Sequence, residues 1–144
     1  MWQDFPGSIS LNPFHKLLPD MKFVFNLHCE VRSIDYSVLI WRDAVLRAGP
    51  KWFGPTSYRI STPEEVRSFF SSLRELNVMF WRRKYDDPTY LDGWSWHVAA
   101  IIDERSLDSK GMNAYPPTFL KFCEHVFNFT QLDGLLSAAE SAVK

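Results

Sequence analysis

Two stretches far apart in the chain alternate apolar and polar side chains with a period of two. The apolar residues of the first are Phe23, Phe25, Leu27, Cys29 and Val31, and those of the second are Trp94, Trp96, Val98, Ala100 and Ile102. Such alternation is typical of strands that bury one face. We therefore expect a sheet with one buried face at the centre of the fold.

Shorter patterns add further strands on either side of these two. We expect strands over 36–46, 57–60 and 78–85, and a short strand that ends at Lys110-Gly111. The dipeptide Asp92-Gly93 predicts a tight turn. Residues 1–20 contain three prolines and predict an irregular leader.

The clearest helix start in the chain is Thr62-Pro63-Glu64-Glu65. It combines a hydroxyl N-cap, a proline at the first helical position and a glutamate at the third, which is a capping box. This helix should end near Asn77. We expect a second helix to begin at Pro116-Pro117 and a third to be capped by Thr130 or Asp133.

The strands come in hairpin-sized groups and do not alternate singly with helices. That order favours an α+β fold, with an antiparallel sheet of about five to six strands and two to three helices packed on one face. The length of 144 residues fits a single domain over 1–144.

Composition excludes several classes of partner and compartment. The formal net charge of −1 gives no strong attraction to nucleic acid or to membranes. No apolar run reaches the roughly 18 residues of a membrane span. The N-terminus lacks a basic region followed by an apolar run, so we expect a cytoplasmic protein in which Cys29 and Cys123 are reduced thiols.

Metal and cofactor sites are not expected. Cys123 and His125 would point about 200° apart on a helix, and His28 and Cys29 would lie on opposite faces of a strand. No glycine-rich loop matches a phosphate-binding pattern. Cys123 lies among phenylalanines, which favours a buried and unreactive thiol.

Two histidines and one basic stretch keep alternative functions open. His28 or His97 could act as a general base in a cleft on the sheet face, which would make the chain a small enzyme. The stretch Trp81-Arg82-Arg83-Lys84 could stack on bases and contact phosphates. However, a strand would divide these charges between two faces, and an acidic run follows, so nucleic acid is not the expected partner.

Aromatic and acidic loops favour a protein partner. Tryptophan is a common anchor of protein interfaces, and charged residues surround such anchors. The candidate contact residues are Trp52 and Phe53 in one loop, Asp86 and Asp87 in a second, and Asp103 and Glu104 in a third.

The stretch 92–117 is unusually dense in special residues, and a structural interpretation accounts for them. Trp94 and Trp96 should face the core, and Gly111 should allow a sharp turn. Asn113 should bond the neighbouring backbone, while Tyr115 and Pro116 set the start of the following helix.

The same stretch resembles a group of small bacterial domains, some of which are suspected immunity proteins that neutralise toxins. The matching residues are Asp92, Gly93, Trp96, Gly111, Asn113, Ala114, Tyr115 and Pro116. The resemblance implies a non-enzymatic inhibitor that occludes a toxin or effector, without a cofactor. It implies no catalytic residues.

Overall fold

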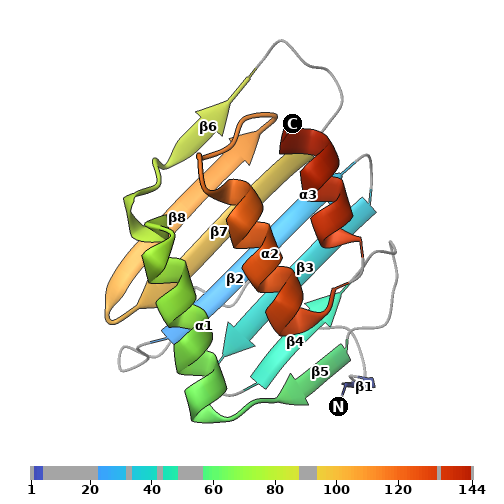
Figure 1. Ribbon diagram of the computed structural model, residues 1–144, viewed down its shortest axis with the longest axis vertical. Helices are drawn as coiled ribbons and strands as arrows, with labels where there is room; N and C mark the ends of the chain where they lie inside the picture. The colour runs from blue at the N-terminus through green and yellow to red at the C-terminus, as the bar shows by residue number, and fades with distance from the viewer. Residues whose placement is uncertain are drawn as a thin grey trace.

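The computed structural model describes residues 2–4, 23–31, 34–41, 44–48, 57–87, 94–132 and 134–143. The strands are β1 (Gln3–Asp4), β2 (Phe23–Val31), β3 (Ile34–Trp41), β4 (Ala44–Ala48), β5 (Ser57–Ile60), β6 (Lys84–Asp86), β7 (Trp94–Ile102) and β8 (Arg105–Met112). They form one sheet in the order β1-β5-β4-β3-β2-β7-β8-β6 (Figure 1). Every pairing is antiparallel except that of β6 with β8.

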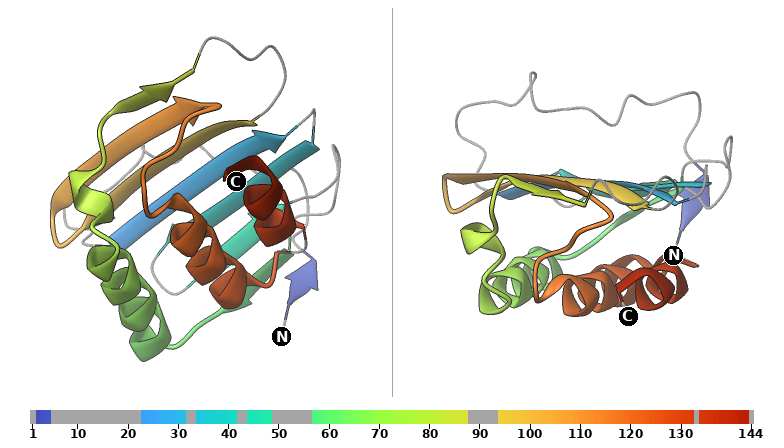
Figure 2. Two further views of the ribbon diagram at one scale, coloured as in Figure 1. Left: turned by 45° about the horizontal axis from the view of Figure 1, so that its top comes forward. Right: turned by 90° about the horizontal axis from the view of Figure 1, so that it is seen from above.

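Three α-helices pack on the same side of this sheet. They are α1 (Pro63–Glu75), α2 (Phe119–Thr130) and α3 (Leu135–Val143), and a short 3-10 turn, η2 (Val78–Phe80), follows α1. Figure 2 shows the sheet edge-on with all three helices on one side. The predicted α+β fold is therefore confirmed, with eight strands in the described residues where about five to six were expected.

The alternation of the central strands assigns each side chain to one of two faces. Phe25, Leu27 and Cys29 of β2 are buried beneath the helices, on what we call the covered face. Asn26, His28 and Glu30 project to the opposite side, which we call the helix-free face. That face is itself divided, because Val24 and Leu39 are buried there whereas Trp41 is 44% exposed.

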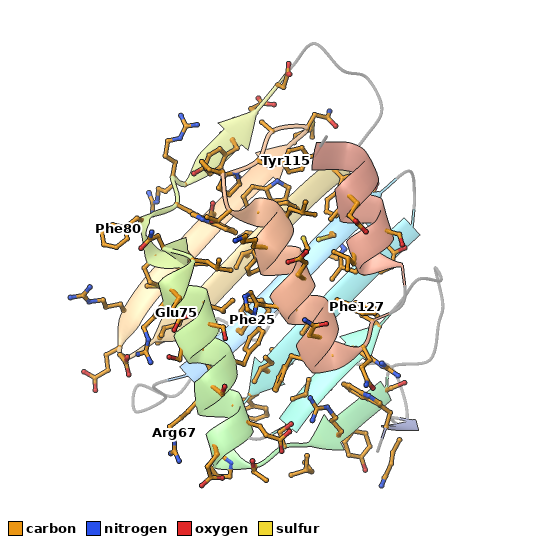
Figure 3. The ribbon with its side chains drawn as sticks, in the orientation of Figure 1. Phe25, Arg67, Glu75, Phe80, Tyr115 and Phe127 are labelled. Atoms are coloured by element: carbon orange, nitrogen blue, oxygen red, sulfur yellow. The ribbon has the colours of Figure 1, made fainter. Side chains whose placement is uncertain are left out.

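Phenylalanine rings from the sheet and the helices form the centre of the covered face. The ring of Phe25 lies 5.4 Å from that of Phe69 and 6.5 Å from that of Phe70, both on α1. It lies 6.0 Å from Phe122 of α2. Phe25 is placed between the two helices over the central strand (Figure 3). This cluster joins both helices to the sheet.

Helix α1 begins as its sequence predicts. The backbone N–H of Glu65 donates to Thr62 Oγ1 over 3.2 Å, and the N–H of Thr62 donates to Glu65 Oε1 over 3.3 Å. These bonds satisfy two donors that a helix start leaves unpaired. The Glu65 carboxylate accepts hydrogen bonds from both the backbone N–H and the hydroxyl of Thr62, and these hold the pKa of Glu65 below its ordinary value.

Two arginines connect the outer strands to the end of α2. Arg47 of β4 donates from Nη1 to the carbonyl oxygens of Thr130 and Gln131, over 2.7 and 2.8 Å. Arg59 of β5 donates to the carbonyl of Phe129. Guanidinium groups at a helix C-terminus satisfy free carbonyls and oppose the helix dipole. The contacts therefore hold the outer strands beneath α2.

Several predicted elements were wrong in their bounds. The single strand expected over 36–46 is two strands, β3 and β4, which pair with each other. Within the leader, β1 pairs with β5, so residues 3 and 4 are not irregular. Thr130 ends α2, where its hydroxyl donates to the carbonyl of Val126, and it does not cap α3. Asp133 lies outside the described residues.

The strand predicted over 78–85 was also largely wrong. Residues 78–80 form η2, and only 84–86 pair as a strand. Asn77 adopts a left-handed conformation (φ 57°) between α1 and η2, so the chain turns there before it can extend. Trp81 then packs inward, with its ring 5.1 Å from that of Phe122.

The segment between Trp94 and Phe119 forms a tightly packed corner. Trp94 and Trp96 are 3% and 2% exposed, which confirms their predicted core positions. Gly111 lies inside β8 and not in a turn. A Cβ at Gly111 would sit 2.4 Å from Trp96 Nε1, so the glycine is required by close packing of the indole. The expected reason for this glycine was therefore wrong.

Asn113 fixes the chain where it leaves β8. Its backbone is left-handed (φ 58°), and its Oδ1 accepts from the N–H of Trp94 over 3.0 Å. Its own N–H donates to the carbonyl of Trp94 over 2.9 Å. Asn113 was expected to bond its neighbouring backbone, and this expectation was wrong. It bonds the start of β7 instead.

Tyr115 and Pro116 shape the approach to α2, as predicted. The Tyr115 ring lies 5.1 Å from that of Phe119, and burial raises the pKa of Tyr115 to about 12. The carbonyl of Pro116 accepts from the N–H of Phe119 over 3.0 Å. The helix itself begins at Phe119, two residues later than the second proline. Asp92 and Gly93, the predicted turn, lie outside the described residues.

Candidate functional site

Two histidines that are distant in sequence lie next to each other on the helix-free face. His28 of β2 is directly opposite His97 of β7. Directly opposed side chains in an antiparallel pair have Cβ atoms about 4.5–5.5 Å apart. The sequence suggested either histidine as a single candidate, and the sheet brings the two into one site.

Each histidine has a carboxylate partner on the strand at its other side. His28 Nε2 is 3.0 Å from Asp35 Oδ1 of β3, and His97 Nε2 is 2.9 Å from Asp108 Oδ1 of β8. All four side chains are about half exposed. A carboxylate in this position orients an imidazole and stabilises its protonated form.

Two lysines extend the line of histidines across the sheet. Lys110 of β8 is opposite His97, and Lys84 of β6 is opposite Lys110. These residues form what we call the histidine–lysine row, which consists of His28, His97, Lys110 and Lys84. A row of four titratable or cationic side chains therefore crosses four adjacent strands.

The histidine–lysine row lies in a hollow of about 470 Å³. The carboxylates of Asp86 and Asp108 and the side chains of Ser95 and Met112 also line it. The volume falls within the roughly 300–1,000 Å³ of ligand pockets in proteins. The hollow is therefore the candidate functional site.

The chemistry of this site is that of proton exchange and ion binding. The imidazole nitrogens can donate or accept hydrogen bonds, and the lysines can bind anions. Across the described residues, no group of three or more histidine, cysteine, aspartate or glutamate side chains is placed to hold a metal ion.

Neither cysteine contributes to the site. Cys29 and Cys123 are fully buried on the covered face, as the sequence predicts for core residues. Burial raises the pKa of both thiols well above the ordinary value. A thiol that stays protonated is a poor nucleophile.

The structure does not unite the residues predicted to contact a partner. Asp86 and Asp87 lie beside Met112, at one end of β8, whereas Asp103 and Glu104 form the turn at its other end. An eight-residue strand separates these ends by roughly 23 Å. Asp103 is also ion-paired with Arg74 of α1. Trp52 and Phe53 lie outside the described residues.

The stretch suggested for nucleic acid is likewise divided. Trp81 is packed into the core and donates from Nε1 to Thr118 Oγ1 over 3.1 Å, so it offers no open ring for stacking. Arg82 lies over the ring of Tyr85 at 4.5 Å, and Arg83 is exposed. Of these residues only Lys84 reaches the hollow.

Several residues of the helix-free face were missed by the sequence interpretation. Trp41, Ile60 and Met112 are 44%, 62% and 53% exposed and lie on this face. Asp35 and Asp108 were not among the candidate residues, although each lies in a strand and contacts a histidine. The signal that could have found them is the polar half of the same period-two alternation.

Comparison with known proteins adds no relative to this description. No protein-family model matches the chain, and no curated protein matches it in sequence. In the part of the chain that the structure describes, no helix is both long enough and apolar enough to cross a membrane.

Proposed function

We propose that this chain is a protein-binding module that docks its partner on the helix-free face of the sheet. The observation that carries the proposal is the position of the large apolar side chains exposed among the described residues. Of these side chains in the described part of the chain, Trp41, Ile60 and Met112 lie on this face and only Phe80 lies elsewhere. Phe80 projects from η2, away from the sheet (Figure 3).

The composition of this face fits a protein interface. Interfaces favour tryptophan and methionine near their centre and place charged groups at the rim. Trp41 is the last residue of β3, an inner strand of the sheet, and Met112 is beside the charged hollow. The proposed mechanism is occlusion, in which Trp41 enters a pocket of the partner and charged groups set the orientation.

The partner we propose is a bacterial toxin or effector, so that the chain acts as an immunity-type inhibitor. The support is the resemblance carried by residues 92–117. In this corner Trp96 packs against Gly111, and Trp94 contacts both Asn113 and Tyr115. That corner holds β7 and β8 in register and so maintains the helix-free face.

The test is co-expression with a toxin encoded beside the gene for this chain. We expect the wild-type chain to rescue growth and to form a complex with the purified toxin. Trp41→Ala should weaken that complex by about 30-fold, the effect of losing an anchor worth about 2 kcal/mol. Phe80→Ala is the matched control, because it removes an exposed aromatic ring from another surface. Failure to rescue, or equal effects of both variants, contradicts the proposal.

A small histidine-dependent enzyme is the second candidate, favoured by the adjacent His28 and His97 in the hollow. Both thiols are buried, so the nucleophile of such an enzyme would be water. One of the paired imidazoles could act as the general base that activates it. His28→Ala and His97→Ala separate the candidates. Rescue that survives both substitutions excludes catalysis, whereas loss of rescue with an intact complex supports it.

A further inference from the structure

The two lysines of the histidine–lysine row are placed in an unfavourable arrangement. Lys84 and Lys110 occupy directly paired positions on adjacent strands, and both are exposed on the helix-free face. Like charges directly opposite each other destabilise a sheet. Among the described residues, no carboxylate forms an ion pair with either ammonium group.

Protection of the sheet edge explains only one of these lysines. β6 is the last strand of the sheet, and a lysine on an edge strand opposes aggregation. Lys110 is on β8, an inner strand at that position, because it pairs with β6 on one side and β7 on the other. Edge protection therefore does not account for Lys110.

The groups around the lysines make the local charge depend on the two histidines. Asp108 Oδ1 is already engaged by His97, at 2.9 Å. The charged and titratable groups that face the row are Glu30 and His28 of β2, Asp35 of β3, His97 of β7, Asp108 and Lys110 of β8, and Lys84 and Asp86 of β6. While the imidazoles are neutral, the carboxylates outnumber the ammonium groups, and protonation of the imidazoles removes this excess.

We infer that the hollow binds a tetrahedral oxyanion, a phosphate or a phosphomonoester, between Lys84, Lys110 and His97. A bound oxyanion relieves the repulsion between the two lysines and accepts charge-assisted hydrogen bonds from them. Protonated His97 supplies a further donor, and Asp108 stabilises that protonated ring. Binding is therefore stronger when the His97 ring is protonated.

The size of the hollow favours a ligand larger than the free ion. At about 470 Å³ it exceeds the space of one phosphate group, and it extends from the lysines toward His28 and Ser95. An organic group esterified to the phosphate would occupy that space. Inorganic phosphate and uridine monophosphate thus form two arms of one experiment, because they share the anion and differ in the ester.

The experiment is an NMR titration of the histidine ring resonances of the intact chain at constant ionic strength. Sulfate is the probe for pH dependence, because its own charge is the same at about pH 6 and about pH 8. Any difference in sulfate affinity between these two pH values therefore comes from the protein. We expect saturable shifts of His97 and about tenfold tighter binding of sulfate at the lower pH, the effect of one added charge-assisted bond. Tighter binding of uridine monophosphate than of phosphate assigns the ester as ligand. Equal binding assigns the free ion.

Variants test whether the site is specific. Lys110→Gln should weaken binding about tenfold, because it removes one charge-assisted bond. Lys121→Gln is the matched control, since Lys121 is an exposed lysine on α2 and far from the hollow. Sulfate affinity that is the same at both pH values, or equal losses in both variants, overturns the inference.

This inference goes beyond the proposed docking of a protein partner, although both concern the helix-free face. The titration needs no partner, and Trp41→Ala should leave sulfate binding unchanged. Loss of toxin rescue with intact anion binding therefore rejects the docking proposal alone. Intact rescue without anion binding rejects this inference alone.

Discussion

The two faces of the sheet are made by the same strands and differ in almost every other respect. On β2 and β7, the covered face carries Phe25, Leu27 and Trp96, all packed against aromatic rings or helices. The helix-free face of the same strands carries His28 and His97, both exposed. The difference indicates that one side of each strand serves stability, while the other is free to carry function.

The largest expected effect is on the covered face. Phe25→Ala should lower the free energy of unfolding by about 3–5 kcal/mol, because it leaves a cavity among the helices. Trp41→Ala, on the neighbouring strand and the opposite face, should cost about 1 kcal/mol, because Trp41 is 44% exposed. Urea denaturation of both variants measures the contrast. Similar costs would mean that Trp41 is a structural residue.

Gly111 should be nearly as sensitive as a core position. Gly111→Ala should cost about 1–3 kcal/mol, because its Cβ would meet the Trp96 indole. Met112→Ala is the control, since Met112 is adjacent in β8 but exposed on the other face. The double variant Gly111→Ala with Trp96→Phe should lose less stability than the sum of the two single losses, because the smaller ring leaves room for the added Cβ. Strictly additive losses would contradict the proposed contact.

Asn113 provides an intermediate case at the corner. Asn113→Ala should cost about 1–2 kcal/mol, because it removes the acceptor of the Trp94 N–H and places alanine at φ 58°. Asn113→Asp keeps the acceptor and should remain close to the wild-type stability in urea. An equal loss in both variants would show that the acceptor is not what matters.

The smallest effects are expected at the histidines. His28→Gln and His97→Gln should each change the free energy of unfolding by less than about 0.5 kcal/mol, because exposed ion pairs contribute little. Chemical denaturation at neutral pH measures this. A loss as large as that of Asn113→Ala would mean that the His–Asp pairs are structural, and the contrast between the two faces would weaken.

The sequence predicted the covered face better than the helix-free face. Apolar alternation in β2 and β7 and the capping box before α1 are local signals, and each was confirmed. A strand was misassigned where local signals conflict: residues 78–85 look extended, yet the left-handed Asn77 and inward Trp81 produce a 3-10 turn.

The candidate site could be predicted only in part, because it depends on the order and register of the strands. His28 and His97 were recognised individually from their positions on polar strand faces. Their proximity follows from the pairing of β2 with β7, which no local pattern specifies. Similarly, Lys84 meets Lys110 only because β6 returns parallel to β8. The acidic loops were separated for the same reason.

The pairing of β2 with β7 also has a consequence for how the chain folds. In the sheet, β2 lies between β3 on one side and β7 of the β7–β8 hairpin on the other. In the chain, residues 32–93 separate β2 from β7. Closing so long a loop makes folding slower than local hairpin formation. During synthesis, one edge of β2 stays unpaired until β7 has left the ribosome. Over that interval the nascent chain presents a nine-residue strand edge that a second chain or a chaperone can occupy.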